Sequence, residues 1–99
     1  MIEKHFVLED VDPVLFYGAG NSNMQLLKAL FPKLRIVARD SVIRVMGDST
    51  ELNRFEDVLV KLERYCNEYN SLKEENIVDI INGQEPSGEK ISNVILFGV

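Results

Sequence analysis

The sequence predicts an α+β domain with the element order β-α-β-β-α, followed by a further short helix and a C-terminal strand. Three observations indicate this class. Residues 34–48 have the pattern of a β-hairpin, residues 52–69 that of a long amphipathic helix, and residues 2–8 and 91–99 that of strands. Because the apolar face of a sheet needs a covering layer, we expect the helices to pack on one face of the hairpin.

The first part of the chain predicts a strand, an irregular stretch and a loop. Residues 2–8 form the strand, and Pro13 interrupts the chain beyond it. Residues 14–17 are therefore expected to be a short extended piece or an edge strand. The loop is GAGNSN, residues 18–23, whose glycine and Asx residues favour positive φ angles or cap a helix.

A short helix is predicted after this loop. Ser22 and Gln25 have the spacing of a capping box, and Pro32 ends the helix. Its apolar face consists of Met24, Leu27, Leu30 and Phe31.

The hairpin is predicted by alternation on either side of the polar pair Asp40 and Ser41. One face carries Ile36, Ala38, Ile43 and Val45. The other carries Arg35, Val37, Arg39, Val42, Arg44 and Met46. A period of two is typical of strands, so we expect one core face and one mostly basic face.

The longest helix comes after the hairpin. Asp48 and Glu51 fit its N-terminal cap, and Asn70 is expected to end it. Apolar residues recur at steps of three and four for almost five turns: Leu52, Phe55, Val58, Leu59, Leu62, Tyr65, Cys66 and Tyr69.

The last third of the chain predicts a shorter helix, a linker and a strand. Ser71 and Glu74 fit a helix cap, and Gly83 stands where a C-cap glycine belongs. The apolar residues of this helix are Ile77, Val78, Ile80 and Ile81. We therefore divide the chain into an accessory domain, residues 1–83, and a linker with a strand, residues 84–99.

The strand pattern of residues 91–99, ISNVILFGV, is strongly apolar. An open apolar edge strand promotes aggregation, so something is expected to cover it. Either residues 91–97 pair with the N-terminal sheet, or the chain is the opening of a longer protein. We favour the second interpretation.

Composition limits the class of protein. A chain of 99 residues forms one domain, and its net charge of -5 means that anion binding needs a local basic patch. Cys66 is the single cysteine, which excludes an intramolecular disulfide. The sequence has neither a run of about 18 to 20 apolar residues nor the pattern of a secretory signal. We expect a cytoplasmic protein without membrane contact.

The sequence predicts no catalytic residue, no metal ligand and no cofactor for this chain. Residues 18–23 lack the Lys-Ser/Thr of a P-loop, and Glu89 replaces the lysine that residues 83–90 would need. His5 is the only histidine, so with one cysteine it cannot form a zinc site. His5 also has no recognisable partners for a nucleophilic triad.

Candidate ligand-binding residues are basic or lie in the glycine loop. The basic candidates are Lys28, Lys33, Arg35, Arg39 and Arg44, and the loop candidates are Gly18, Gly20, Asn21 and Asn23. The arginines on the hairpin are placed to contact RNA phosphates, and helix N-termini bind phosphate readily. Alternatively, the arginines pair with Asp and Glu on the open face, and the loop is a turn with a cap.

Two motifs resemble the N-terminal domain of PhoH-like proteins. They are GAGNSN-x-x-LL, including Asn21, Asn23, Leu26 and Leu27, and RIVARD-x-x-IRVMGD, residues 35–48. The resemblance covers nearly the whole chain. It implies a βαββα domain, similar in outline to KH-type RNA-binding domains, before a P-loop ATPase domain that binds ATP and Mg. The family is associated with phosphate starvation and is thought to act on RNA.

The chain departs from the expected pattern at two points. Asp40 and Ser41 replace the usual glycine of the hairpin turn, and Gly18 and Gly20 are too close for the GxxG loop of a KH domain. The ATPase residues implied by the resemblance lie outside these 99 residues, so this chain is not expected to hydrolyse ATP.

Two functions remain open at this point. The first is a non-catalytic accessory domain of a PhoH-like ATPase that assists RNA binding or subunit assembly. The second is a structural module without nucleic-acid contact, which packs on its own ATPase domain or forms a homo-oligomer.

Overall fold

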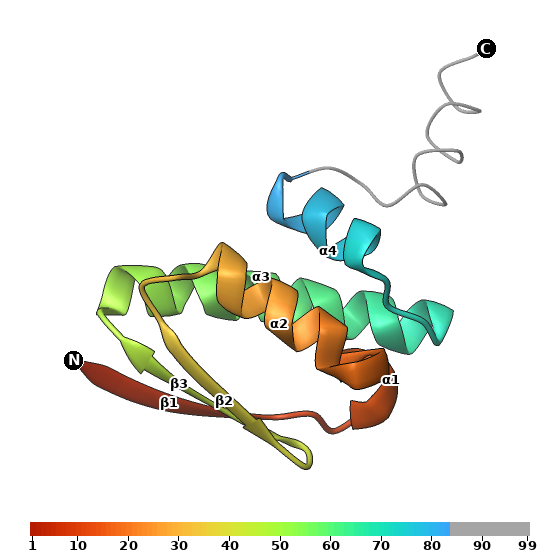
Figure 1. Ribbon diagram of the computed structural model, residues 1–99, viewed down its shortest axis with the longest axis horizontal. Coiled ribbons are helices and arrows are strands. Elements are labelled where there is room, and N and C mark those ends of the chain that lie inside the picture. Colours follow the sequence, from red (N-terminus) through yellow and green to blue (C-terminus); the bar gives the residue numbers. More distant parts are fainter. Residues whose placement is uncertain (84–99) are drawn as a thin grey trace.

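The computed structural model describes residues 1–83 and has an antiparallel sheet with helices on one side (Figure 1). The strands are β1 (Ile2–Val7), β2 (Arg35–Arg39) and β3 (Val42–Gly47), in the order β1-β3-β2. The helices are α1 (Pro13–Tyr17), the 3₁₀ turn η1 (Ala19–Asn21), α2 (Ser22–Leu30), α3 (Ser49–Tyr69) and α4 (Glu74–Ile81). The predicted α+β class is confirmed.

The alternation predicted for the hairpin is also confirmed. Ile36, Ile43 and Val45 are buried and point into the core, whereas Arg35, Arg39 and Arg44 are exposed. Antiparallel pairing places side chains of directly opposite residues on the same face, so the core face of β1 follows from its register with β3. Phe6 lies opposite Ile43 and packs against the core.

The long helix α3 supplies much of this core. Its buried residues are Leu52, Phe55, Val58, Leu59, Leu62 and Cys66, which are six of the eight residues of the predicted apolar stripe. Of the other two, Tyr65 is partly buried against the core and Tyr69, near the end of the helix, is exposed. Asp48 caps the helix as predicted, because its Oδ1 accepts a hydrogen bond from Glu51 N at 2.9 Å. Asn70 ends the helix in the left-handed conformation, with a φ of 52°.

The expectation for residues 14–17 was wrong, because they belong to helix α1. Pro13 occupies the first turn, where its missing N–H and fixed φ are compatible with a helix. Asp12 Oδ1 accepts a hydrogen bond from Val14 N at 3.0 Å, which caps the helix. Phe16 and Tyr17 are thereby buried beside α2.

Two of the predicted caps were also wrong. Helix α2 begins at Ser22 itself, and its N-cap Asn21 makes no side-chain cap hydrogen bond. Helix α4 is capped at Lys73, whose N–H donates to Asn76 Oδ1 at 3.0 Å. The chain therefore stays extended beyond Ser71 before the last described helix begins. Gly83, with a φ of 75°, comes after α4 as predicted for a glycine after a helix.

The hairpin turn contacts the end of α1. Asp40 has a φ of 53°, a conformation that non-glycine residues adopt uncommonly. The hydroxyl of Tyr17 donates a hydrogen bond to Asp40 O at 2.7 Å. This contact joins the end of α1 to the tip of the hairpin.

The predicted linker and strand, residues 84–90 and 91–99, lie outside the described residues. Within residues 1–83, no helix combines the length and the apolar character that crossing a bilayer requires.

Candidate functional site

The strand order creates a sheet face that no helix of the described chain covers (Figure 1). We call it the open face. The pairing registers assign to it Glu3, His5 and Val7 from β1, Val42, Arg44 and Met46 from β3, and Arg35, Val37 and Arg39 from β2. Three arginines outnumber the carboxylates of Glu3 and the adjacent turn residue Asp40, although the whole chain has a net charge of -5. The open face is therefore locally basic.

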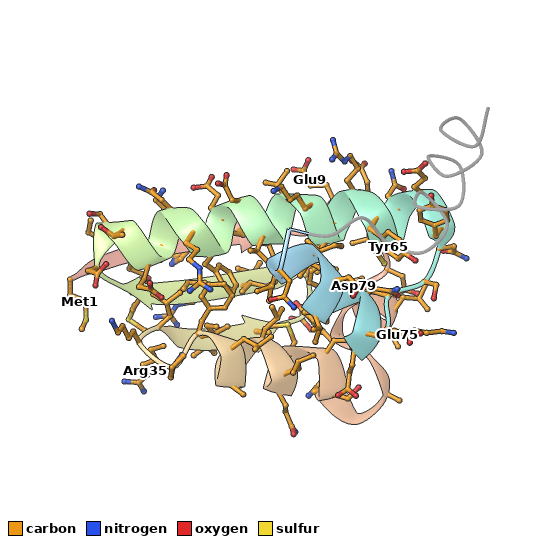
Figure 2. The ribbon with its side chains drawn as sticks, turned by 90° about the horizontal axis from the view of Figure 1, so that it is seen from above. Met1, Glu9, Arg35, Tyr65, Glu75 and Asp79 are labelled. Carbon is orange, nitrogen blue, oxygen red and sulfur yellow. The ribbon has the colours of Figure 1, made fainter. Side chains whose placement is uncertain are left out.

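Arg35 and Arg39 are exposed on the edge strand β2. Figure 2 shows Arg35 projecting away from the ribbon into solvent. Neither guanidinium forms an ion pair with any residue of the described range 1–83. The interpretation that the arginines pair with Asp and Glu therefore does not apply to these two residues within that range.

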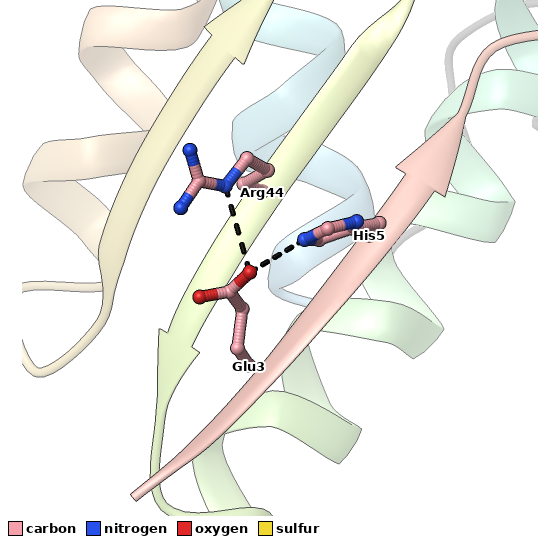
Figure 3. A network of polar contacts seen from close by, with 3 residues as sticks. All are labelled: Glu3, His5 and Arg44. Atoms are coloured by element: carbon pink, nitrogen blue, oxygen red, sulfur yellow. Dashed lines mark hydrogen bonds and ion pairs between the residues drawn. The ribbon is translucent and has the colours of Figure 1, made fainter.

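Arg44, on the central strand, is in a different situation. Its Nε lies 3.6 Å from Glu3 Oε2, and the same oxygen accepts a hydrogen bond from His5 Nε2 at 2.5 Å (Figure 3). The hydrogen bond with His5 is the largest cause that lowers the pKa of Glu3, and the charge of Arg44 lowers it further. Arg44 thus has a carboxylate within ion-pair distance, whereas neither Arg35 nor Arg39 forms an ion pair within residues 1–83.

A hollow of about 270 Å³ lies beside these side chains at the hairpin end of the face. It is lined by Val37, Arg39, Asp40, Val42 and Arg44. Val37 is 38% exposed, so the hollow combines apolar surface with the guanidinium groups of Arg39 and Arg44.

The two predicted lysines are not part of the open face. Lys28 is exposed on α2, which belongs to the layer on the other side of the sheet. Lys33 is exposed in the connection between α2 and β2, two residues before Arg35. Only Lys33 is therefore adjacent in the chain to the exposed arginines.

The loop of residues 18–23 has a structural explanation. Asn23 is 2% exposed, and its Nδ2 donates hydrogen bonds to Phe16 O at 3.1 Å and to Leu72 O at 2.9 Å. Gly18, Gly20 and Asn21 all have positive φ angles, between 60° and 84°. The loop turns the chain from α1 into α2, and the Asn23 side chain fastens it to the connection between α3 and α4.

The sequence alone does not connect His5 with both Glu3 and Arg44. The spacing of Glu3 and His5 by two residues does indicate that they share a face of β1. The sequence does not show that β1 pairs with β3, and only this pairing places His5 opposite Arg44.

The described residues contain no group of three His, Cys, Asp or Glu side chains that could hold a metal ion. Cys66 is buried, and burial raises the pKa of its thiol. A buried thiol of this kind is inert rather than nucleophilic at neutral pH.

Comparisons of the chain with protein-family models, with curated proteins and with solved structures found no match.

Proposed function

We propose that this chain is a non-catalytic accessory domain that binds single-stranded RNA through the open face. The observation that carries the proposal is the pair of exposed arginines, Arg35 and Arg39, which make no ion pair within residues 1–83. A guanidinium group donates paired N–H bonds that match the geometry of a phosphate.

The positions of the two arginines suit an extended polyanion. Arg39 is four positions after Arg35 along β2, which corresponds to roughly 13 Å at about 3.3 Å per residue. At this distance they contact different phosphates of one strand. Val37 lies between them in the chain and presents apolar surface, against which a base is removed from water. Backbone contacts of this kind supply affinity and little sequence preference.

The resemblance to PhoH-like proteins supports the proposal that this RNA-binding domain is part of a larger ATPase. In that setting the domain precedes a P-loop ATPase domain, which binds ATP and Mg, in a cytoplasmic protein. The accessory domain would hold RNA near its own ATPase domain. The open face is then the contribution of this chain, and ATP hydrolysis belongs to the other domain.

Titration of the chain into a fluorescently labelled single-stranded RNA, at low and moderate salt, tests the proposal. Three neutralised phosphates give a slope of log K against log salt of roughly -2, since each contributes about -0.7 with single strands. The variant Arg35→Ala/Arg39→Ala/Arg44→Ala is expected to lose this binding.

The matched control removes three cations from the helical layer: Lys61→Ala/Arg64→Ala/Lys73→Ala. These side chains are exposed on or next to α3 and α4. Each variant removes three cations, so the control changes the net charge by the same amount as the open-face variant. Equal loss of binding in both variants would mean that overall charge, not the open face, determines binding. A folded chain that binds no RNA at any salt would refute the proposal.

The second candidate is a protein–protein or homo-oligomerisation module. Val60 favours it, because this residue is 57% exposed on the outer side of α3. An apolar contact there is insensitive to salt, unlike a contact with phosphate. Self-association that persists at high salt in sedimentation experiments, and disappears in Val60→Asp, would support this function.

A further inference from the structure

One carboxylate oxygen on the open face serves two partners. Glu3 Oε2 accepts a hydrogen bond from His5 Nε2 and lies 3.6 Å from Arg44 Nε (Figure 3). Glu3 and His5 are on β1, and Arg44 lies directly opposite His5 on β3. All three side chains are about half exposed, at 40%, 55% and 49% respectively, so a ligand reaches them from solvent.

We propose that Glu3 competes with RNA phosphate for Arg44, and that protonation of His5 weakens this competition, so that the open face binds RNA more tightly in mildly acidic solution. This inference rests on the proposed function. It adds two residues that determine the affinity for RNA, Glu3 and His5, and it makes that affinity depend on pH.

The competition follows from the geometry. While His5 is neutral, Glu3 keeps its full negative charge beside Arg44, and an incoming phosphate must replace this carboxylate. The carboxylate also repels the phosphate directly. Both effects reduce the contribution of Arg44 to RNA binding.

Protonation of His5 changes both effects in the same direction. The imidazolium forms an ion pair with the Glu3 carboxylate and offsets its negative charge. The imidazolium also repels the Arg44 guanidinium, because like charges directly opposite each other on antiparallel strands repel. Arg44 and protonated His5 therefore both gain from an additional anion. Because RNA binds the protonated form more tightly, its affinity is higher in mildly acidic than in neutral solution.

The other neighbours of His5 do not interfere with this mechanism. The charged groups that face it are Glu3 on β1 and Arg44 on β3, and no helix of the described chain packs on this face. The remaining adjacent side chains of the open face are uncharged: Val7, Val37, Val42 and Met46. The lowered pKa of Glu3 keeps its carboxylate charged in mildly acidic solution, so the response comes from His5.

Fluorescence anisotropy with a labelled oligouridylate at pH 7.5 and pH 5.5, at one low ionic strength, tests this inference. Uracil has no basic nitrogen that titrates in this range. The chain is expected to bind about fivefold more tightly at pH 5.5, the factor for one additional unit charge about 4 Å from a phosphate in water. His5→Gln should remove the response to pH.

Glu3→Gln provides the complementary variant, because it removes the competing charge and keeps the shape of the side chain. It is expected to bind at pH 7.5 about as tightly as the unchanged chain does at pH 5.5. Both substitutions are at exposed positions, and far-UV circular dichroism confirms that the variants are folded.

The outcomes separate the two proposals. RNA binding that is equal at both pH values, or a response that His5→Gln retains, overturns this inference and leaves the proposed function standing. Absence of RNA binding by every variant at both pH values refutes the proposed function and this inference with it.

Discussion

Asn23 is a buried polar side chain that connects two parts of the helical layer. Its amide donates to Phe16 O at 3.1 Å and to Leu72 O at 2.9 Å, and the side chain is almost completely buried. It therefore joins the end of α1 to the connection between α3 and α4. The substitution Asn23→Ala removes both hydrogen bonds and supplies no replacement donor.

The cost of Asn23→Ala follows from these two bonds. Each intramolecular hydrogen bond contributes about 1 kcal/mol net, and a buried carbonyl left without a donor adds to the loss. We expect the free energy of unfolding to fall by about 2 to 3 kcal/mol. This is a large part of the roughly 5 to 15 kcal/mol that stabilises a typical domain.

Urea denaturation followed by circular dichroism at 222 nm measures this loss. Asn53→Ala is the matched control, because Asn53 is exposed on α3 and alanine favours a helix. The control should be neutral or slightly stabilising. A change for Asn23→Ala within about 0.5 kcal/mol of the control would contradict the assignment of a structural role, since surface substitutions alone give changes of this size.

Two further predictions concern the same end of the molecule. Gly18→Ala should lower thermal stability more than Gly20→Ala. Both glycines have positive φ, but a Cβ at Gly18 would lie 2.8 Å from Ser22 Oγ and 3.0 Å from Asn23 Cγ, whereas the space at Gly20 is open. Equal losses would show that backbone conformation alone matters. Tyr17→Phe should cost about 1 kcal/mol in urea denaturation, because it removes the 2.7 Å bond to Asp40 O. Burial raises the pKa of Tyr17, so its contribution is present below about pH 10 and is lost as pH rises through the pKa of the folded state. On going to alkaline solution, the Tyr17→Phe variant should therefore lose less stability than the unchanged chain does. An equal loss in both would contradict the assignment of this loss to the ionisation of Tyr17.

The parts of the fold predicted correctly are those with a long periodic signal. Helix α3 has 21 residues, enough for its apolar stripe to repeat over several turns and to distinguish it from a strand. The hairpin has two runs of alternation joined by a two-residue turn, so its inward and outward faces were predictable residue by residue.

The parts predicted wrongly depend on short-range capping that competes with the periodic signal. Helix α1 has only five residues, too few for a recognisable apolar stripe, and Pro13 was interpreted as an interruption. The Asp12 cap makes the same proline a helix start. At α4, Asn76 bonds the backbone of Lys73, so the helix begins later than the pattern at Ser71 indicates.

The candidate site shows a different limit of sequence reasoning. Alternation predicts that Arg35, Arg39 and Arg44 share a face, but it treats them as equivalent. The strand order makes them unequal, because β3 lies between β1 and β2. Arg44 therefore has β1 as a neighbour and meets Glu3, whereas Arg35 and Arg39 are on an edge strand without a carboxylate partner in residues 1–83.

This inequality gives the open face its chemical character. An arginine that already has a carboxylate partner gains less from a phosphate than one that has none, because it must first lose that partner. Under the proposed function, Arg35 and Arg39 are accordingly the part of the face that binds an anion without losing a partner in residues 1–83, and Arg44 is the part whose availability depends on Glu3 and His5. The order β1-β3-β2, which no single segment of the sequence specifies, is thus what divides three similar side chains into two roles.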